Sequence, residues 1–375
     1  MDSLDSLGSA TSEESVNHRV SPTSWPAPIR EVTLVAGGAQ GQIKKVALEN
    51  GLVLAAKIFS GRDALKQLQR EFAQFTAVGQ HPHFPACHGI KEIGHDLCLV
   101  FDFIEGTPLS HLGEALTSLM KTGTEFSQST AAAVLLARQL FAGLSHLEQL
   151  EIAHCDIKPE NLILDSQLRL HIVDLGMAKA FSEERKSSGS FSYLPPELTK
   201  STDNARPMNH SKVDSYSAAN VILGIATGLK LGQDFETLVP VSTGGALSEL
   251  VRCIYKTHVE RRLSANTMDS AEKPELHLSP TGRFFGSDPL FNSLLGLLSQ
   301  CLHSNWSDRP SCQQATAALN ALVMSPHELQ LAQELLTRSQ SFAVTQAKKH
   351  HIFDLDPPPQ IKLKPAPTTR RQAHC

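Results

Sequence analysis

The sequence contains no apolar run close to the ~20 residues that a helix needs to cross a bilayer. Its first residues, MDSLDSLGSATSEESVNHRV, lack the apolar core of a secretory signal peptide. Charge of one sign is not in excess either, because 34 basic and 38 acidic residues leave a net charge of −4. We therefore expect a soluble, cytoplasmic protein that has no membrane span and does not have nucleic acid as its main partner.

Cysteine is sparse and irregularly spaced. The seven cysteines are Cys87, Cys98, Cys155, Cys253, Cys301, Cys312 and Cys375, and no two of them form a CxxC pair. This spacing favours neither a zinc site nor a disulfide framework, and it is typical of thiols in a reducing compartment. With 375 residues, 41% of them apolar, the chain is long enough to fold into one large or two moderate globular domains.

The two ends of the chain differ in composition from its middle. Residues 1–28 are rich in Ser, Pro and small polar residues, which predicts a disordered leader. This leader could be an uncleaved bacterial export signal or simply a solvated end. Residues 325–350 are predicted to form a helix. Residues 351–375 are Pro-rich and basic, which predicts an extended or disordered tail that either binds a partner protein or is a linker.

One stretch, HCDIKPENLIL at residues 154–164, combines an acid, a base, an amide and a proline with an apolar, strand-like segment. Asp156 can accept a proton from a hydroxyl group, and Lys158 can neutralise phosphoryl oxygens. Asn161 offers an oxygen to a hard cation such as Mg²⁺. Taken alone, the stretch also fits a polar turn in a hydrolase or a binding domain.

In residue types and spacing this stretch resembles the H-R-D-x-K-x-x-N catalytic loop of eukaryotic-like Ser/Thr protein kinases. The resemblance implies that Asp156 is the catalytic base, that Lys158 assists it, and that Asn161 binds a metal ion. It continues at Asp174-Leu175-Gly176, which is similar to the family's D-F-G and implies that Asp174 also binds Mg²⁺.

Upstream, a strand, a Gly-rich turn and a second strand precede a lysine on an otherwise apolar strand. Gly38, Gly41 and Ile43 match the second and third glycines and the aliphatic residue of the kinase Gly-rich loop. The resemblance implies that Lys57 binds the phosphates of ATP and pairs with Glu71, on a helix predicted from Asp63 to Val78. The alternatives to these two assignments are a simple hairpin turn and an ordinary solvent-exposed glutamate.

The segment 102–106 follows two predicted strands and resembles the kinase hinge. The resemblance implies that main-chain groups near Asp102 and Ile104 bind the adenine edge and that Phe101 is the gatekeeper residue. Apolar side chains on both sides of the ring complete the expected nucleotide site: Val35, Ile43, Ala55 and Ile163.

Downstream of these motifs, four more residues extend the resemblance into a helical lobe. Ser190, in a segment similar to G-T-x-x-Y, would bond to Asp156 and Lys158. Glu197 ends a Pro-Pro-Glu that stands where the family has Ala-Pro-Glu, and it should pair with Arg309 in N-W-S-D-R-P. The motif at Asp214 resembles D-x-W-S-x-G at the start of a buried central helix that runs to Thr227.

Between Gly228 and Pro289 the match fades. Four basic residues there form either a docking surface or a solvated face: Arg252, Lys256, Arg261 and Arg262.

The expected fold is α+β, a two-lobed protein kinase fold with a small β-rich lobe (29–101), a hinge (102–106) and a larger helical lobe (107–324). The resemblance implies transfer of the γ-phosphoryl of ATP, with Mg²⁺, to a Ser or Thr of a protein substrate. Two alternatives stay open: a pseudokinase that acts as a binding scaffold, and a small-molecule kinase of the antibiotic-phosphotransferase type.

Cys155 departs from the family at the position of the catalytic-loop arginine, which reads a phosphate on the activation segment. A thiol cannot form those bidentate contacts, so we expect activity that needs no phosphorylation of that segment. The departures at Ala36, Cys155, Leu175 and Tyr216 also resemble those of secreted bacterial effector kinases, which implies delivery into a host cell's cytoplasm.

Overall fold

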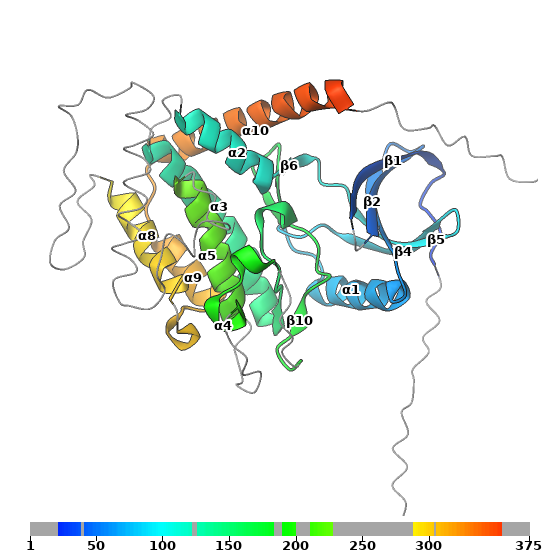
Figure 1. Ribbon diagram of the computed structural model, residues 1–375, viewed down its shortest axis with the longest axis horizontal. Helices are drawn as coiled ribbons and strands as arrows, with labels where there is room; N and C mark the ends of the chain where they lie inside the picture. Colours follow the sequence, from blue (N-terminus) through cyan, green and yellow to red (C-terminus); the bar gives the residue numbers. More distant parts are fainter. Residues whose placement is uncertain are drawn as a thin grey trace, which may run out of the picture.

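The computed structural model describes residues 22–38, 41–121, 126–183, 190–199, 211–227, 288–303 and 305–354. A small part built on a β-sheet is joined to a larger helical part through the segment between strands β5 and β6 (Figure 1). The α+β, two-lobed fold expected from the sequence is confirmed.

The small lobe is an antiparallel sheet of five strands in the order β1-β2-β3-β5-β4. The strands are β1 (Ile29–Gly38), β2 (Gly41–Leu48), β3 (Val53–Phe59), β4 (Cys87–Ile93) and β5 (Asp96–Asp102). Side chains alternate between the two faces of a sheet, and in this sheet both faces carry buried apolar side chains. On one side helix α1 (Ala64–Val78) packs, and its Phe75 ring lies 4.5 Å from that of Phe101.

Residues 22–28 cover the other face of the sheet, so the predicted disordered leader extends too far at its C-terminal end. The main-chain N–H of Thr23 donates to the carbonyl of Ile90 at 2.8 Å, and the indole of Trp25 donates to the carbonyl of Glu92 at 2.9 Å. Trp25 packs against a buried cluster of the sheet. Average composition identified this stretch as polar, whereas its hydrogen bonds to β4 and the packing of Trp25 bind it to the lobe.

The large lobe is mainly helical. Its helices are α2 (Leu109–Lys121), α3 (Phe126–Gln149), α4 (Pro196–Thr199), α5 (Ser211–Thr227), α8 (Pro289–Cys301), α9 (Cys312–Ala321) and α10 (Pro326–Asp354). Helix α3 packs against α5, α8, α9 and α10. The predicted central helix is confirmed, since nearly every described side chain of α5 is buried.

Short strands and 3-10 turns of the large lobe carry or flank the polar motifs. They are β6 (Gly106–Pro108), β7 (Ile152–Ala153), η1 (Pro159–Asn161), β8 (Leu162–Asp165), β9 (Leu170–Ile172), β10 (Lys179–Ala180) and η2 (Phe191–Tyr193), and η4 (Trp306–Asp308) precedes α9. Strands β6, β8 and β9 form one small sheet, and β7 pairs with β10. Both small sheets hold the catalytic-loop segment against the large lobe.

Among the residues that the structure describes, one helix is long and apolar enough to cross a membrane by length and composition alone. It is the stretch Ser127–Gln149 of α3, and 72% of its most apolar window is buried inside the protein. A core helix surrounded by other helices has the same composition, so this feature is weak evidence for a membrane span.

Several predicted features lie outside the described residues. They are the first 21 residues of the leader, Ser187 and Ser188, the basic residues Arg252, Lys256, Arg261 and Arg262, and the tail after Asp354. Helix α10 continues to Asp354, four residues past the predicted end at residue 350.

Candidate active site

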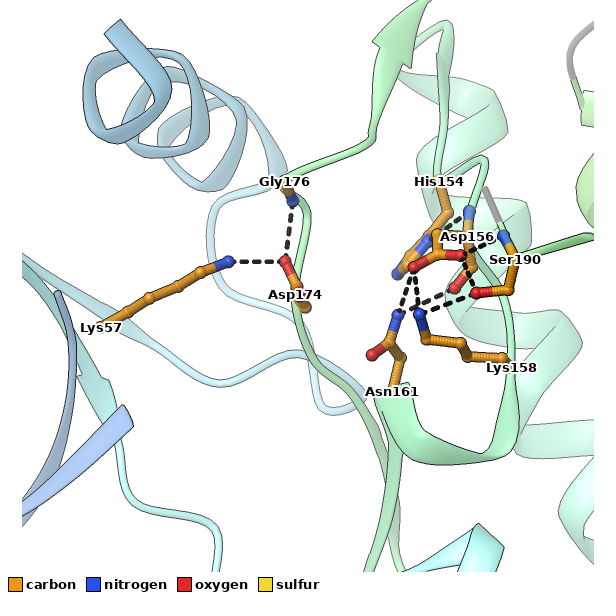
Figure 2. A network of polar contacts seen from close by, with 8 residues as sticks. All are labelled: Lys57, His154, Asp156, Lys158, Asn161, Asp174, Gly176 and Ser190. Carbon is orange, nitrogen blue, oxygen red and sulfur yellow. Dashed lines mark hydrogen bonds and ion pairs between the residues drawn. The ribbon is translucent and has the colours of Figure 1, made fainter. Parts of the chain in front are cut away.

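A buried lysine on β3 joins the two lobes. The ammonium of Lys57 donates to both carboxylate oxygens of Glu71, at 2.9 and 2.7 Å, and to Oδ1 of Asp174 at 2.7 Å. Glu71 lies on α1 of the small lobe, and Asp174 follows β9 of the large lobe. The predicted pair of Lys57 and Glu71 is thus present, and Lys57 also bonds Asp174 (Figure 2).

Lys57, Glu71 and Asp174 form a triad in which the charge of each group depends on the other two. Burial alone would lower the pKa of Lys57, but the two carboxylates outweigh it and raise the pKa, so the ammonium stays protonated. Burial raises the pKa of Glu71 to about 7, against the attraction of Lys57. Burial also acts upward on Asp174, yet Lys57 and the N–H of Gly176 lower its pKa below the usual range. Asp174 is therefore ionised and able to bind a cation.

The glycine after Asp174-Leu175 lies in crowded surroundings. A Cβ at Gly176 would lie 3.0 Å from Oδ1 of Asp174 and 3.1 Å from a carboxylate oxygen of Glu71. Asp174 itself has a φ of 69°, in the left-handed region, and its carboxylate accepts the N–H of Gly176 at 3.0 Å. Gly176 therefore leaves room for the triad to close.

A second polar cluster surrounds Asp156 (Figure 2). Its Oδ2 accepts hydrogen bonds from Lys158 at 2.7 Å and from the amide of Asn161 at 3.1 Å. Its Oδ1 accepts the main-chain N–H and the hydroxyl of Ser190, at 2.8 and 2.9 Å. Lys158 also donates to the Ser190 hydroxyl at 2.9 Å. The predicted bonds of Ser190 to Asp156 and Lys158 are confirmed.

A buried carboxylate on α5 holds the loop that carries Asp156. Asp214 accepts the main-chain N–H groups of His154 at 2.7 Å and Cys155 at 2.9 Å. Cys155 has a φ of 63°, which costs a non-glycine residue roughly 1–2 kcal/mol. Burial raises the pKa of Asp214 to about 7, while the two N–H groups act in the opposite direction. Asp214 thus satisfies both N–H groups of a turn that would otherwise be unfavourable.

The predicted phosphate loop lies at the β1–β2 turn. Gly38 pairs with Gly41 across the turn, and residues 39 and 40 lie outside the described residues. A Cβ at Gly41 would approach the carbonyl oxygen of Ile58 to 2.0 Å, so this glycine is required by strand packing. The close approach of the Gly41 backbone to β3 is therefore a sufficient reason for glycine at this position, independent of phosphate binding.

The predicted adenine-binding residues come from both lobes. Cross-strand partners share a face, so the pairs Ile43 with Lys57 and Ala55 with Phe101 place these four side chains on the α1 side of the sheet. The other two predicted apolar residues lie elsewhere. Val35 on β1 is 52% exposed, and Ile163 lies on β8 of the large lobe.

The hinge residues lie where the two lobes join. Asp102 ends β5, and its N–H donates to the carbonyl of Ala86 at 3.0 Å, so that N–H is not available to a base. Its carboxylate bonds the ring of His88 at 2.7 Å. Ile104 lies in the irregular segment before β6.

The distant pair predicted for the large lobe is also present. Both terminal nitrogens of Arg309 donate to the carboxylate of Glu197, at 2.6 and 2.7 Å.

Two polar side chains near the site were missed in the sequence. Arg70 donates to the carbonyl of Ala178 at 2.7 Å, and Gln74 donates to the same oxygen. Their spacing of four residues could have shown that they share one side of the helix. Their target is a main-chain carbonyl, which has no signature in the sequence.

Comparison with known proteins decides the family. A family model described as Protein kinase domain matches residues 30–319. The chain belongs to the protein kinase family. Lys57, Asp156, Asn161 and Asp174 all lie within the matched residues.

Three kinases illustrate the similarity. A probable LRR receptor-like serine/threonine-protein kinase of Arabidopsis thaliana is 31% identical over 207 residues, which cover 52% of this chain and 19% of that protein. The LRR receptor-like serine/threonine-protein kinase GSO1 of Arabidopsis thaliana is 27% identical over 312 residues, 78% of this chain and 23% of that protein. The serine/threonine-protein kinase cds1 of Schizosaccharomyces pombe is 29% identical over 213 residues, 52% of this chain and 44% of that protein. Each match spans less than half of the relative's length.

Kinases of this family use ATP with Mg²⁺, and the polar groups around Asp156 and Asp174 fit both. Within the described part of the chain, both hydrogen bonds of Asp174 go to Oδ1, which leaves Oδ2 for a cation. The amide nitrogen of Asn161 bonds to Asp156, and its oxygen is turned toward the side on which Asp174 lies (Figure 2). A carboxylate and an amide oxygen are ligands that Mg²⁺ prefers. The ammonium of Lys57 would supply a positive charge for the phosphates.

Proposed function

We propose that this kinase transfers the γ-phosphoryl of ATP to the hydroxyl of a Ser or Thr in a protein substrate. The observation that carries the proposal is the cluster of Asp156, Lys158 and Asn161 opposite the Lys57 and Asp174 pair (Figure 2). The chain's similarity to kinases named as serine/threonine-specific supports the choice of acceptor. Lys158, two residues after Asp156, is the Ser/Thr form of the loop motif.

Each group has a definite task in this proposal. Asp156 would accept the proton of the incoming hydroxyl, and Lys158 beside it would neutralise charge on the transferred group. The hydroxyl of Ser190 donates to Asp156 at 2.9 Å, and in this proposal a substrate hydroxyl would donate to Asp156 in the same way. Lys57, Asn161 and Asp174 would orient ATP with Mg²⁺, which supplies the phosphoryl group and the charge neutralisation.

A transfer assay distinguishes the three candidate functions. The full chain is incubated with γ-labelled ATP, Mg²⁺, and either protein or small-molecule acceptors, alongside Asp156→Ala and the exposed-acid control Asp96→Ala. We expect labelled Ser or Thr in protein, a loss of ~10²–10⁴-fold in Asp156→Ala, and wild-type rates in the control. Equal labelling by Asp156→Ala would contradict the enzyme function.

Two other outcomes identify the alternatives. Nucleotide binding without transfer by the wild type would indicate a pseudokinase scaffold. Labelling of small molecules only would indicate a small-molecule kinase.

We further propose that activity needs no phosphate on the activation segment. The position that would read such a phosphate holds Cys155, whose buried thiol is held uncharged because burial raises its pKa. The test is the triple variant Ser187→Ala, Ser188→Ala and Ser192→Ala, which we expect to keep nearly all transfer to an added substrate. A large loss of activity would refute this part of the proposal. Ser190 is left unchanged because it contacts Asp156 directly.

A further inference from the structure

Helix α1 is attached to the large lobe by contacts other than the Lys57 triad. Arg70 and Gln74 both donate to the carbonyl oxygen of Ala178, two residues beyond Gly176. The guanidinium of Arg70 also lies 3.3 Å from a carboxylate oxygen of Glu183. Helix α1 and strand β10 accordingly lie side by side (Figure 1).

The segment that receives these contacts is itself fixed on the large lobe. Lys179 and Ala180 form β10, which pairs with β7 just before the catalytic loop. The N–H of Phe181 donates to the carbonyl of Glu151 at 2.8 Å. Ala178 therefore presents its carbonyl from a held position, and the bonds to α1 connect the two lobes.

Glu183 is held in a tight turn. One of its carboxylate oxygens accepts the N–H of Ala180 at 3.1 Å, and its own N–H donates to the Ala180 carbonyl at 3.0 Å. The other carboxylate oxygen faces Arg70. A fixed anion of the chain, Glu183, thus stands next to the cation of α1, Arg70.

The contacts differ in expected weight. The Arg70 and Glu183 side chains are 43% and 47% exposed, so water and salt weaken their ion pair. The two bonds to the Ala178 carbonyl are partly buried, and one of them has a charged donor. Bonds of that kind contribute more than an exposed ion pair. The two bonds to the Ala178 carbonyl should therefore contribute more to the attachment of α1 than the ion pair of Arg70 with Glu183 does.

We propose that Arg70 and Gln74 are positioning residues, which hold α1, and with it Glu71, against Lys57 by binding the main chain at Ala178 without any phosphate on the activation segment. This inference rests on the proposed kinase function for its kinetic consequence. Its structural consequence, the docking of α1, is independent of activity. Glu71 belongs to the same helix and lies one residue from Arg70, so movement of α1 would separate Glu71 from Lys57.

The test compares the full-length double variant Arg70→Ala, Gln74→Ala with the control Lys66→Ala, an exposed basic residue on the same helix. Hydrogen exchange of amides in residues 64–83 and 174–183 measures docking directly. We expect faster exchange in both segments of the double variant, and unchanged exchange in α3 and in the control. Transfer kinetics should show kcat/KM for ATP lower by roughly tenfold or more, as expected for one charged and one neutral hydrogen bond.

Two further variants separate positioning from simple loss of stability. Arg70→Lys keeps a charged donor, so its rate should lie between those of the wild type and the double variant. Glu183→Gln should change the rate less than threefold, because the bonds to the Ala178 carbonyl remain. The KM for the protein acceptor should stay constant while that for ATP rises.

The possible results separate the docking role of Arg70 and Gln74 from the proposed kinase function. Unchanged exchange in α1 of the double variant overturns the inference, whether or not the wild type transfers phosphate. A wild type whose rate falls after phosphatase treatment also overturns it. A wild type without any transfer, together with faster exchange in the double variant, contradicts the proposed function and leaves the docking role supported.

Discussion

Arg309 and Glu197 form a bidentate ion pair across 112 residues of sequence, with nitrogen-to-oxygen distances of 2.6 and 2.7 Å. The arginine side chain is completely buried, and its Nε donates to the carbonyl of His303 at 2.6 Å. Its guanidinium also lies 4.8 Å from the centre of the Tyr216 ring. The pair therefore links the segment after the activation loop to α5 and to the end of the helical lobe.

Breaking this pair should destabilise the large lobe. In Glu197→Ala the buried guanidinium loses its charged partner, which typically costs about 3–5 kcal/mol of unfolding free energy. Urea denaturation measures the loss, with the exposed Glu49→Ala as the control. A double-mutant cycle with Arg309→Met should show strong coupling, because the double variant leaves no buried charge. Additive losses would contradict a direct interaction.

Ser190 should be sensitive to the loss of its hydroxyl and tolerant of threonine. Its hydroxyl donates to Asp156 and accepts from Lys158, so it keeps the two catalytic side chains in register. In Ser190→Ala we expect kcat to fall by about tenfold, the effect of one hydrogen bond to a charged group. Ser190→Thr keeps the hydroxyl and should retain most of the rate. Steady-state kinetics measures both, with Ser192→Ala as the neighbouring control, and a wild-type rate in Ser190→Ala would show that the contact is dispensable.

The parts of the site that were predictable from the sequence are those in which side chains bond to side chains. Lys57 with Glu71 and Arg309 with Glu197 could be paired because each member stands in a recognisable motif. Contacts that end on the main chain leave no such trace. Arg70 reaches a carbonyl, and so do the groups that hold residues 22–28 on β4.

The strained backbone conformations of Cys155 and Asp174 could not be predicted from the sequence either. Cys155 and Asp174 both have a positive φ, which glycine or asparagine would have signalled. In this chain the strain is held by tertiary contacts, namely Asp214 for the loop at Cys155 and Lys57 for the turn at Asp174. The neighbours that stabilise such a conformation come from distant segments, and only folding brings them together.

His81 should make the protein sensitive to mild acid. Its ring stacks on that of His146 at 4.4 Å, and His83 is 5.5 Å away. Burial, followed by these two rings, lowers the pKa of His81 from 6.5 to about 4. Between those values the unfolded chain binds a proton that the folded chain does not, so the free energy of unfolding should fall as the pH drops from 6.5 to 4.

Chemical denaturation at a series of pH values checks this expectation. His81→Gln should show a shallower decline in stability over that interval than the wild type, and the exposed control His95→Gln should show the wild-type slope. Identical slopes in His81→Gln and the wild type would assign the acid sensitivity to other groups.

Helix α10 should stabilise the strand that follows the catalytic loop, although all of it lies beyond the matched kinase domain. The amide of Gln340 donates to the carbonyls of Leu164 and Asp165 at 2.9 and 3.0 Å, at the end of β8. Gln340→Ala removes the donor to two partly buried carbonyls, which should cost about 1–3 kcal/mol of unfolding free energy. Gln330→Ala, an exposed glutamine of the same helix that bonds only Glu334 among the described residues, is the matched control. Both variants are compared by urea denaturation and by hydrogen exchange of residues 162–172. We expect faster exchange there in Gln340→Ala only, because β8 loses its support from α10, and equal stability of the two variants would show that α10 is attached through its apolar face alone.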